Sequence, residues 1–454
     1  MQTTQLKDKD VLVLGLGRSG MAAATLLSRD GARVVVRDEG DGDVLRERAS
    51  QLRERGVRVE LGNHFDWAKH FDLAVLSPGI APERPMVREV TKRHLPVLSE
   101  LELAYRFCLC PIVAITGTNG KTTTTELITE AVLGCDKRAI AAGNIGYALS
   151  DAAEQSASLD ALVVEVSSFQ LEKIDRFRPD VGVWLNLTPD HLDRHGSMED
   201  YAKAKARLFL NQKREDVAIL STQALNWARR VGASFNSRLI TIAANGDTAD
   251  LWLDPVDRQT IWSWLPECRG IVMRLDETNL RGQHNAENIL ATLAAGIALG
   301  LPVRGVREAI LGYCPQPHRC ELVAEINGVT FINDSKATNV DAVAQALQSL
   351  PGPVVLIAGG RDKALEFTGL KEVMTGKVKL AVVIGETADK LRAAWGGVVP
   401  CQRAATMAEA VRLAAQHARR GDTVLLSPAC ASFDMFRNYE HRGDEFKAQV
   451  LSLR

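Results

Sequence analysis

The apolar run Ile112–Ile115 leads directly into residues 116–123, which read TGTNGKTT. An apolar run followed by a glycine-rich loop, a lysine and a threonine predicts a buried strand, a phosphate-binding turn and the start of a helix. In such a loop the backbone N–H groups surround phosphates, Lys121 reaches the β- and γ-phosphates, and the Thr122 hydroxyl lies on Mg²⁺. Ile115 stands where the complete P-loop pattern has its first glycine, so the chain carries the shortened form GxxGK[ST].

A second glycine loop lies near the start of the chain. Residues 15–20 read GLGRSG after the apolar run Val11–Leu14, and Asp38 ends the next apolar run about 20 residues later. This pattern is typical of a turn that holds a diphosphate at a helix N-terminus, but it does not specify what the nucleotide carries. NAD is one interpretation among several, and a tight turn that binds nothing is the alternative.

Polar residues also follow predicted strands in the central part of the chain. Glu165 lies at the end of the run 162–166, and Asp190 and His191 follow the run 181–187. Because ligands of parallel sheets bind at the carboxyl ends of the strands, these side chains are expected to face the same crevice as the phosphate loop. Glu165 is a hard oxygen donor suited to Mg²⁺. Local capping is the alternative for Glu165, and loop packing is the alternative for His191.

The last third carries two loops of small polar residues, each directly after a predicted strand. They are NDSKATN at 333–339 and SPACASFD at 427–434. Both suit an anionic ligand, while capping of the following helix is an equally good interpretation. A further stretch, 201–207, reads YAKAKAR and, taken alone, is typical of a solvated basic helix face.

Short runs of Val, Ile and Leu recur along the chain, each followed by small polar residues and a helical-looking polar stretch. This alternation predicts α/β domains with parallel sheets. The 454 residues are about three times the usual domain length, and proline-bearing gaps near 108–111 and 312–317 divide them. We therefore expect three α/β domains, 1–109, 110–314 and 315–454, with a strand insertion at 245–277. The predicted strands are 11–14, 33–36, 73–76, 112–115, 162–166, 181–187, 217–220, 354–357, 381–384 and 423–426.

The composition excludes several classes of protein. The 55 Lys and Arg residues nearly balance 56 Asp and Glu residues, which argues against a nucleic-acid binder and against a polybasic membrane-surface protein. Residues 1–10 lack the apolar stretch of a secretory signal, and the longest apolar run, 289–303, is too short to span a bilayer and predicts a buried helix. Eight scattered cysteines without a CxxC are typical of reduced thiols, so we expect a cytoplasmic protein.

The ordered series of motifs resembles the Mur ligases of bacterial cell-wall synthesis, and within them the branch that adds D-glutamate. The resemblance covers the whole chain, and this family uses the shortened TGTNGK[ST] loop. It implies a Rossmann-like UDP-binding domain, a central P-loop ATPase-like domain and a C-terminal Rossmann-like domain. The motifs are GLGRSG (15–20), SPG (77–79), GTNGKTT (117–123), NIG (144–146), EVSSFQLE (165–172), NLTPDHLDRH (186–195), HNAEN (284–288), PHR (317–319), DSKATN (334–339) and SPACASFDMF (427–436).

The resemblance assigns each domain a ligand: the uridine diphosphate of a nucleotide sugar for 1–109, ATP and magnesium for 110–314, and D-glutamate for 315–454. The positions that match the UDP-sugar site are Arg18, Ser19, Asp38, Ser77 and Gly79. Those that match the ATP site are Gly117, Thr118, Asn119, Gly120, Lys121, Thr122, Thr123, Asn285, Asn288, Arg319, Asp334 and Lys336. Those that match the D-glutamate site are Thr338, Lys363, Ser432, Phe433 and Tyr439.

The resemblance also implies a reaction. ATP phosphorylates the terminal carboxylate of UDP-N-acetylmuramoyl-L-alanine (UDP-MurNAc-L-alanine), and the amine of D-glutamate attacks the resulting acyl phosphate. Thr122 and Glu165 would hold one Mg²⁺, and a second would lie between His191 and a carbamate formed on Lys205. The third domain of an expected monomer would close over the site and exclude water. The implied catalytic residues are Lys121, Asn144, Glu165, His191 and Lys205.

Two other classes remain as alternatives. One is a sister ATP-dependent amide ligase, either another Mur ligase or a folylpolyglutamate synthase-like enzyme, although the GLGRSG and SPACASFD motifs argue against folate. The other is an NAD-dependent oxidoreductase, which GLGRSG and Asp38 alone would suggest. The GTNGKTT loop has no role in that chemistry.

Overall fold

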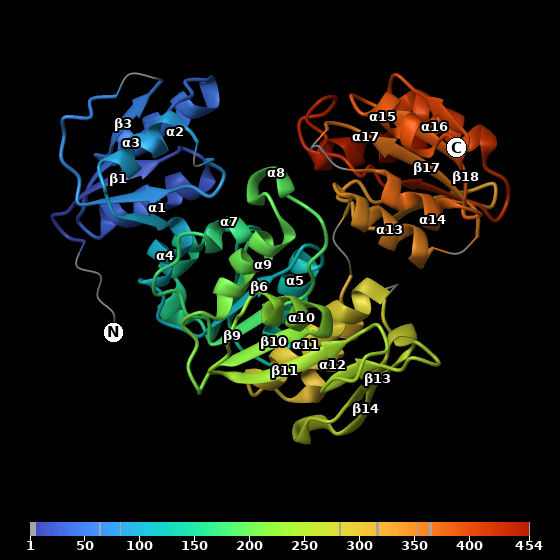
Figure 1. Ribbon diagram of the computed structural model, residues 1–454, viewed down its shortest axis with the longest axis horizontal. Coiled ribbons are helices and arrows are strands. Elements are labelled where there is room, and N and C mark those ends of the chain that lie inside the picture. Colours follow the sequence, from blue (N-terminus) through green and yellow to red (C-terminus); the bar gives the residue numbers. More distant parts are fainter. Residues whose placement is uncertain are drawn as a thin grey trace.

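The structure is a computed structural model that describes residues 6–62, 65–81, 83–280, 283–314, 317–350, 352–362 and 366–453. The described residues form three β-sheets, each flanked by helices, and the predicted three-domain α/β architecture is confirmed. In Figure 1 the first domain (blue) and the third (orange to red) lie on opposite sides above the central domain. Among the described residues, no helix is both long and apolar enough to cross a membrane.

The first domain has a five-stranded sheet in the order β3-β2-β1-β4-β5, and every strand pair in it is parallel. Residues 11–14 of the central strand are fully buried, as expected for a strand covered on both faces. The strands are β1 (Asp10–Leu14), β2 (Arg33–Asp38), β3 (Arg58–Leu61), β4 (Leu73–Leu76) and β5 (Val97–Ser99), and the helices are α1 (Arg18–Arg29), α2 (Asp43–Arg53), α3 (Pro85–Lys92) and α4 (Glu100–Tyr105).

Helix α4 joins the first two domains. Its residues Leu101 and Ala104 pack into the core of the central domain. The fully buried carboxylate of Glu102 accepts the consecutive backbone N–H groups of residues 175, 176 and 177 at 2.8–2.9 Å. The junction is therefore packed and hydrogen-bonded, and the exact boundary at residue 109 stays a prediction.

The central domain has a nine-stranded sheet in the order β14-β13-β12-β11-β10-β9-β6-β8-β7. It is parallel from β12 to β7, so β6 and its neighbours β8 and β9 end at the same edge. The strands are β6 (Ile112–Thr116), β7 (Ala139–Gly143), β8 (Ala161–Glu165), β9 (Val181–Trp184), β10 (Val217–Ser221), β11 (Arg238–Ala243), β12 (Leu251–Leu253), β13 (Thr260–Ser263) and β14 (Gly270–Arg274).

Helices cover both faces of this sheet. They are α5 (Lys121–Leu133), α6 (Leu149–Ala153), α7 (Ser168–Leu171), α8 (Leu192–His195), α9 (Met198–Ala206), α10 (Thr222–Arg230), α11 (Gln283–Ala298) and α12 (Val303–Gly312). The apolar run 289–303 was predicted to be one buried helix, and this is wrong at its end. Helix α11 stops at Ala298, the chain turns through Gly300 at a φ of +67°, and α12 begins at Val303.

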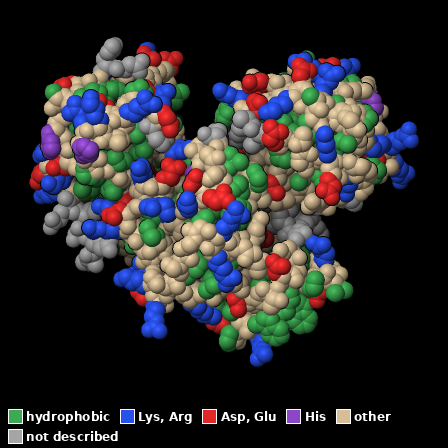
Figure 2. Space-filling view, viewed as in Figure 1, with side chains coloured by type: hydrophobic (Ala, Val, Ile, Leu, Met, Phe, Trp, Pro, Cys, Tyr) green, Lys and Arg blue, Asp and Glu red, His purple; other side chains and the backbone are tan. Residues whose placement is uncertain are grey.

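The predicted strand insertion is confirmed as β12, β13 and β14, which pair antiparallel at one end of the sheet. Trp252 stacks on Trp262 and on Trp264, with ring centroids 6.3 and 5.1 Å apart. Trp264 and Ile271 are exposed. Figure 2 shows apolar side chains gathered at the lower right, over β13 and β14. The insertion is thus an aromatic extension at the far end of the sheet from β6.

The third domain has a six-stranded sheet in the order β15-β16-β20-β17-β18-β19, parallel except for the β15–β16 pair. The strands are β15 (Glu321–Ile326), β16 (Val329–Asn333), β17 (Val354–Gly359), β18 (Val378–Ile384), β19 (Cys401–Arg403) and β20 (Thr423–Leu426). The helices are α13 (Val340–Ser349), α14 (Lys371–Met374), α15 (Ala388–Trp395), α16 (Met407–His417) and α17 (Tyr439–Leu451). The boundary between residues 314 and 315 also stays a prediction.

Candidate active site

The phosphate loop joins β6 to the N-terminus of α5. Gly120, the residue before α5, has a φ of +82°, and a Cβ there would meet Asn288 Oδ1 at 2.3 Å, so only glycine fits. Lys121 Nζ donates to the carbonyl oxygens of Gly117 and Thr118, both at 2.9 Å. Burial lowers the pKa of Lys121, although nearby carboxylates oppose the effect. The loop therefore holds a lysine at a helix N-terminus, where an anion is favoured.

Glu165 connects the end of β8 to the loop. Its carboxylate accepts a hydrogen bond from the Thr122 hydroxyl at 2.7 Å and another from Asn144 Nδ2 at 2.7 Å. Glu165 is 2% exposed. The structure thus brings three of the predicted site residues, Thr122, Asn144 and Glu165, into one hydrogen-bonded group of oxygen-bearing side chains.

Lys205 lies beneath the phosphate loop. Its Nζ donates to Gly117 O at 2.8 Å and to Thr116 Oγ1 at 3.4 Å. The residue is 1% exposed, so its side chain is shielded from solvent. Burial, with a further contribution from the charge of Lys121, holds the pKa of Lys205 well below its ordinary value, against the attraction of Asp190 and Glu165.

The two lysines of α9 have different surroundings. Lys203 is exposed and forms an ion pair with Asp200 at 3.0 Å. Tyr201, in contrast, is 2% exposed, and Lys205 Nζ lies 4.5 Å from the centre of its ring. The solvated-face interpretation of the stretch 201–207 is therefore wrong for Tyr201 and Lys205 and right for Lys203.

His191 belongs to an aromatic cluster beside the loop. Its ring packs edge-on against Phe169, with ring centroids 4.9 Å apart, and against Tyr201 at 6.5 Å. The Asp190 carboxylate lies 3.7 Å from His191 Nε2. Within the described part of the chain, no three His, Cys, Asp or Glu side chains converge to hold a metal ion.

A cavity of about 450 Å³ opens between the central and third domains. It collects most of the residues that were predicted from both domains to bind ATP. Its wall includes Asn119, Gly120, Thr123, Asn285, Asn288, Arg319, Asp334 and Lys336. The cavity therefore connects the phosphate loop to α11 and to the loop after β16.

Asp334 and Lys336 face this cavity from the third domain. Asp334 accepts hydrogen bonds from Ser427 Oγ at 2.8 Å and from the backbone N–H of Cys320 at 3.2 Å, and burial raises its pKa to about 7. Lys336 Nζ lies 3.8 Å from the centre of the Tyr439 ring, and burial lowers its pKa to about 8. Burial desolvates both groups, which raises the free energy of their ionised forms.

The two loops of the third domain are held together by Arg442 of α17, a fully buried residue. Its guanidinium donates to Ser335 Oγ and O at 2.9 and 2.7 Å, and to the carbonyl oxygens of Cys430 and Ala431 at 3.0 and 3.3 Å. This arginine fixes the position of Ser432, the next residue along. No sequence signal had pointed to Arg442.

The predicted D-glutamate residues are only partly gathered. Ser432 is buried, Thr338 and Tyr439 are half-buried, and Phe433 is exposed. Lys363 lies outside the described residues. The described members therefore lie in or next to the two loops, and they do not all contact one another.

In the first domain Asp38 organises the GLGRSG turn. Its carboxylate accepts the backbone N–H of Leu16 at 2.7 Å and of Gly40 at 2.8 Å. Ser77 Oγ lies 3.5 Å from the carbonyl oxygen of Gly15. Asp38 and Ser77 therefore hold the turn from both neighbouring strands.

The other residues predicted for the UDP-sugar site lie around this turn. Ser19, in the first turn of α1, is half-buried, and Gly79, in the loop after β4, is exposed. The Arg18 side chain crosses to the central domain, where it donates to the carbonyl oxygen of Gly146. The turn thus opens towards the central domain.

Comparison with known proteins places the chain in a family. Three family profiles match in order: "Mur ligase MurD-like, N-terminal domain" at residues 9–99, "Mur ligase middle domain" at 115–296 and "Mur ligase, glutamate ligase domain" at 318–430. A UDP-N-acetylmuramoylalanine--D-glutamate ligase of Acidobacterium capsulatum is 42% identical, over 99% of this chain and 98% of that protein. One of Pelotomaculum thermopropionicum, with the same name, is 44% identical over 99% of both chains.

The chain belongs to the Mur ligase family. Solved structures of Mur ligases share its fold at low sequence identity. The MurF ligase of Thermotoga maritima in complex with ADP has a TM-score of 0.62 and 17% identity, covering 99% of this chain and 97% of that one. The UDP-N-acetylmuramate-alanine ligase MurC of the same organism has a TM-score of 0.60 and 17% identity, over 98% and 100% of the two chains.

This Mur ligase also has contacts at the domain interface that the sequence did not predict. Asn119 of the phosphate loop donates to Asp341 on α13, and Asn339, the residue before α13, donates to Asn119 Oδ1 at 3.3 Å and to Asp190 Oδ2 at 3.2 Å. Polar residues of this kind have no characteristic spacing, so only the fold brings them together. The third domain thereby contacts the phosphate loop directly.

Proposed function

We propose that this chain is an ATP-dependent ligase that adds D-glutamate to UDP-MurNAc-L-alanine through an acyl phosphate. The observation that carries the proposal is the convergence of Lys121, Glu165 and Lys205 at one edge of the central sheet, next to the cavity between the central and third domains. The names of relatives at 42% and 44% identity over nearly the whole chain support this substrate choice.

Lys121 has a defined part in the proposed reaction. The triphosphate of ATP and the substrate carboxylate are both anionic and repel each other. A cation held at the helix N-terminus stabilises this negative charge more strongly than water does, because it is already in position before phosphoryl transfer begins. Closure of the third domain would keep water from the acyl phosphate.

Mur ligases use ATP and Mg²⁺, and the chain has a suitable group of hard oxygen donors at the first proposed metal position. The Thr122 hydroxyl and the Glu165 carboxylate already contact each other at 2.7 Å, and Asn144 orients the second carboxylate oxygen. A magnesium ion bound there would neutralise charge between the triphosphate and the acceptor carboxylate. Asn144 and Glu165 therefore act by holding oxygen atoms in place.

The second proposed metal position lies between His191 and Lys205. An unmodified Lys205 offers no metal ligand, whereas a carbamate on its Nζ would be an anionic oxygen donor of the kind that Mg²⁺ prefers. Carbon dioxide reacts with the neutral amine, and the burial that lowers the pKa of Lys205 favours this form.

The remaining residues bind and orient the substrates. We assign the GLGRSG turn with Arg18, Ser19, Asp38, Ser77 and Gly79 to the uridine diphosphate, and Asn285, Asn288, Arg319, Asp334 and Lys336 to ATP. D-Glutamate would lie near Thr338, Ser432, Phe433 and Tyr439, with Lys363 added by the resemblance alone. Each of the three domains of one chain supplies one ligand site, which fits a monomer. The substrates are cytoplasmic metabolites, so we place the reaction in the cytoplasm.

Product formation with UDP-MurNAc-L-alanine, ATP, Mg²⁺ and a panel of amino acids tests the proposal. We expect ADP, phosphate and an amide product with D-glutamate only. Product with a different amino acid would instead indicate a sister Mur ligase. A thermal-shift comparison of UDP-MurNAc-L-alanine, ATP and NAD separates the oxidoreductase alternative, because a ligand of the folded state raises its stability.

A further inference from the structure

Asn186 lies just after β9 with its side chain against the phosphate loop. Its Oδ1 accepts the backbone N–H groups of Thr118 at 3.1 Å and Asn119 at 2.9 Å. Its Nδ2 donates to Asn119 O at 3.3 Å and to Glu287 Oε2 at 2.7 Å. One amide therefore holds two consecutive residues of the loop, and one carboxylate holds that amide.

The contact with Glu287 determines which way the amide points. An amide turned by 180° would present its NH₂ group to the two backbone N–H groups of the loop, where no hydrogen bond can form. The Glu287 carboxylate accepts hydrogen bonds and cannot donate when ionised, so it selects the orientation that keeps Oδ1 on the loop. The short distance of 2.7 Å is typical of a hydrogen bond to a charged acceptor.

Glu287 also lies on the helix that supports the rest of the loop. On the same first turns of α11, Asn288 Oδ1 accepts a hydrogen bond from Thr124 Oγ1 of α5 at 3.1 Å, and Asn288 Nδ2 donates to Asn285 at 3.0 Å. Helix α11 thus contacts Asn186 through Glu287, and it contacts α5, the helix that follows the loop, through Asn288.

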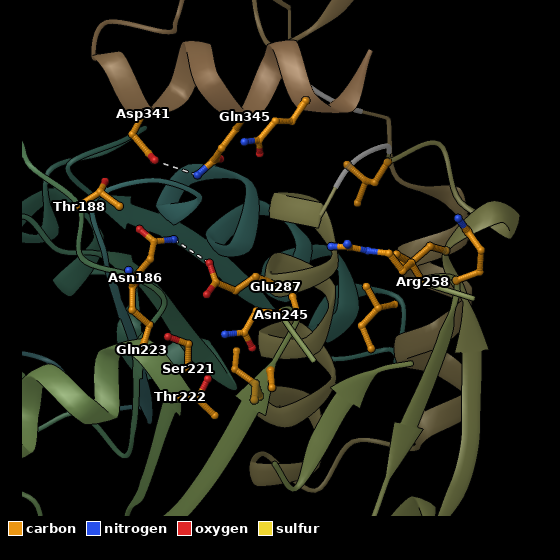
Figure 3. Close-up of a pocket in the computed structure, with 18 residues that line it drawn as sticks. Asn186, Thr188, Ser221, Thr222, Gln223, Asn245, Arg258, Glu287, Asp341 and Gln345 are labelled. Carbon is orange, nitrogen blue, oxygen red and sulfur yellow. Dashed lines mark hydrogen bonds between the residues drawn. The ribbon is translucent and has the colours of Figure 1, made fainter. Parts of the chain in front are cut away.

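Asn186 and Glu287 line a second cavity, of about 750 Å³, beside the loop. Figure 3 shows the two side chains pointing towards each other, with Asp341 and Gln345 of α13 above them and Ser221 below. Burial raises the pKa of Glu287 to about 7; the hydrogen bond from Asn186 opposes this shift, and the charge of Asp341 adds to it. Arg258 is the remaining charged residue in the cavity wall.

We propose that Asn186, oriented by Glu287, is a positioning residue that fixes the phosphate loop for ATP. It touches neither substrate nor reacting atoms, and acts by holding Thr118 and Asn119 so that the following N–H groups and Lys121 face the triphosphate. The inference rests on the proposed ATP-dependent function. A displaced loop loses both ATP affinity and turnover, because phosphoryl transfer depends on the position of these groups.

The test exchanges the donor and the acceptor of the pair. Asn186→Asp places two carboxylates next to each other, and at pH 8 we expect kcat/KM for ATP to fall about 100-fold. In the double variant Asn186→Asp with Glu287→Gln, the glutamine amide donates to the aspartate, whose other oxygen still accepts from the loop. We expect this variant to recover at least about tenfold relative to Asn186→Asp. The KM for D-glutamate should stay within about twofold throughout.

Gln348→Glu is the matched control, since it adds a carboxylate to the same cavity wall from α13, away from the loop. It should leave the kinetics for ATP unchanged. If Asn186→Asp does not fold, as judged by circular dichroism, Glu287→Gln alone remains informative because it keeps an acceptor oxygen but cannot ionise. The ratio of its KM for ATP to that of the wild type should rise between pH 6 and 8, as the wild-type carboxylate ionises and binds Asn186 more tightly.

Wild-type ATP kinetics in Asn186→Asp, or no recovery in the double variant, would overturn the positioning role. So would a pH-independent KM ratio for Glu287→Gln. Failure of the proposed function is a separate result, because the wild type would then form no product with D-glutamate. In that case calorimetry with ADP on the same variants decides the loop question: the role holds if Asn186→Asp weakens ADP binding and the second substitution restores it.

Discussion

The molecule has two glycine loops, each between a buried strand and a helix, and their surroundings differ in charge. Neither helix has a side-chain cap at its start. The loop at residues 15–20 is held by the carboxylate of Asp38, which accepts the backbone N–H of Leu16 in the loop and that of Gly40 after β2. The loop at residues 117–120 has Lys121 and the buried Lys205 within hydrogen-bond distance of its carbonyl oxygens. The first loop is thus fixed by an anionic side chain and the second by cationic ones, and we expect diphosphate binding at the first and phosphoryl transfer at the second.

Removing the cation of the second loop tests this difference most directly. Lys121→Ala should lower turnover by about 1,000-fold, because the charge facing the triphosphate is lost while the core is not touched. Lys121→Arg should fail as well, since a planar guanidinium cannot replace an ammonium in a tight loop. The rate of phosphate release measures the turnover of both variants, and thermal unfolding checks that they fold. Near-normal phosphate release by Lys121→Ala would show that the second loop does not need its cation, and the proposed difference between the two loops would then be wrong.

The buried lysine gives the next largest effect. Lys205→Ala should lower activity by about 100-fold, as expected for loss of a metal ligand. Added acetate should restore part of it by occupying the vacated position. Lys203→Ala is the control: it is two residues away, about 200° round the helix axis, and its partner Asp200 is exposed. Equal losses at both lysines, or no acetate rescue and no dependence on carbon dioxide, would argue against the carbamate.

Substitution of Asp38, which accepts a hydrogen bond from the first loop, should have a smaller and more selective effect. Asp38→Ala leaves the backbone N–H of Leu16 in the turn, and that of Gly40 after β2, without their acceptor, a loss worth about 1–2 kcal/mol. We expect the KM for UDP-MurNAc-L-alanine to rise about tenfold and the KM for ATP to stay unchanged. Calorimetry of the wild type should detect binding of UDP-MurNAc-L-alanine and no binding of NAD. A rise in the KM for ATP would show that the loops do not act separately.

The last effect is on stability and not on activity, and it concerns the buried carboxyl that faces the second loop from the third domain. The pKa of Asp334 is raised to about 7, so its folded form holds a proton that the unfolded chain has already released above pH 4. This contribution is complete at about pH 4 and is lost as the pH rises to 7. Between these values the free energy of unfolding should fall by about 1–3 kcal/mol more in the wild type than in Asp334→Asn. Denaturant titrations at the two pH values measure it, and parallel curves would contradict it.

Much of the fold could be predicted because apolar strands are easily recognised. The run 423–426 is β20 with the predicted bounds, and 73–76 is β4. Two of the missed strands lack that signal: β3 reads RVEL, with charges on alternate residues, and β7 reads AIAAG, with small side chains. Strand β11, which reads RLITIA, was missed although it is apolar. Periodicity favours long apolar side chains, so short strands such as β3 and β7 become visible only when neighbouring strands pair with them.

The site was less visible in the sequence. Glycine loops could be recognised because their backbone geometry restricts the residue type, and Glu165 because it ends a strand. The burial of Lys205 could not, since its helix face reads as basic and solvated, and only the resemblance to Mur ligases singled it out. Asn186 and Glu287 are 101 residues apart in the chain, and their hydrogen bond has no local signature.

The stacked indoles of the insertion have a spectroscopic consequence. Three of the seven tryptophans, Trp252, Trp262 and Trp264, lie together on β12 and β13 or just after them, at the end of the central sheet away from β6. The part of the near-ultraviolet circular dichroism that these three indoles contribute will report the integrity of the central domain. Movement of the outer domains on ligand binding leaves this signal unchanged, and an extrinsic dye on the first or third domain is needed to follow it.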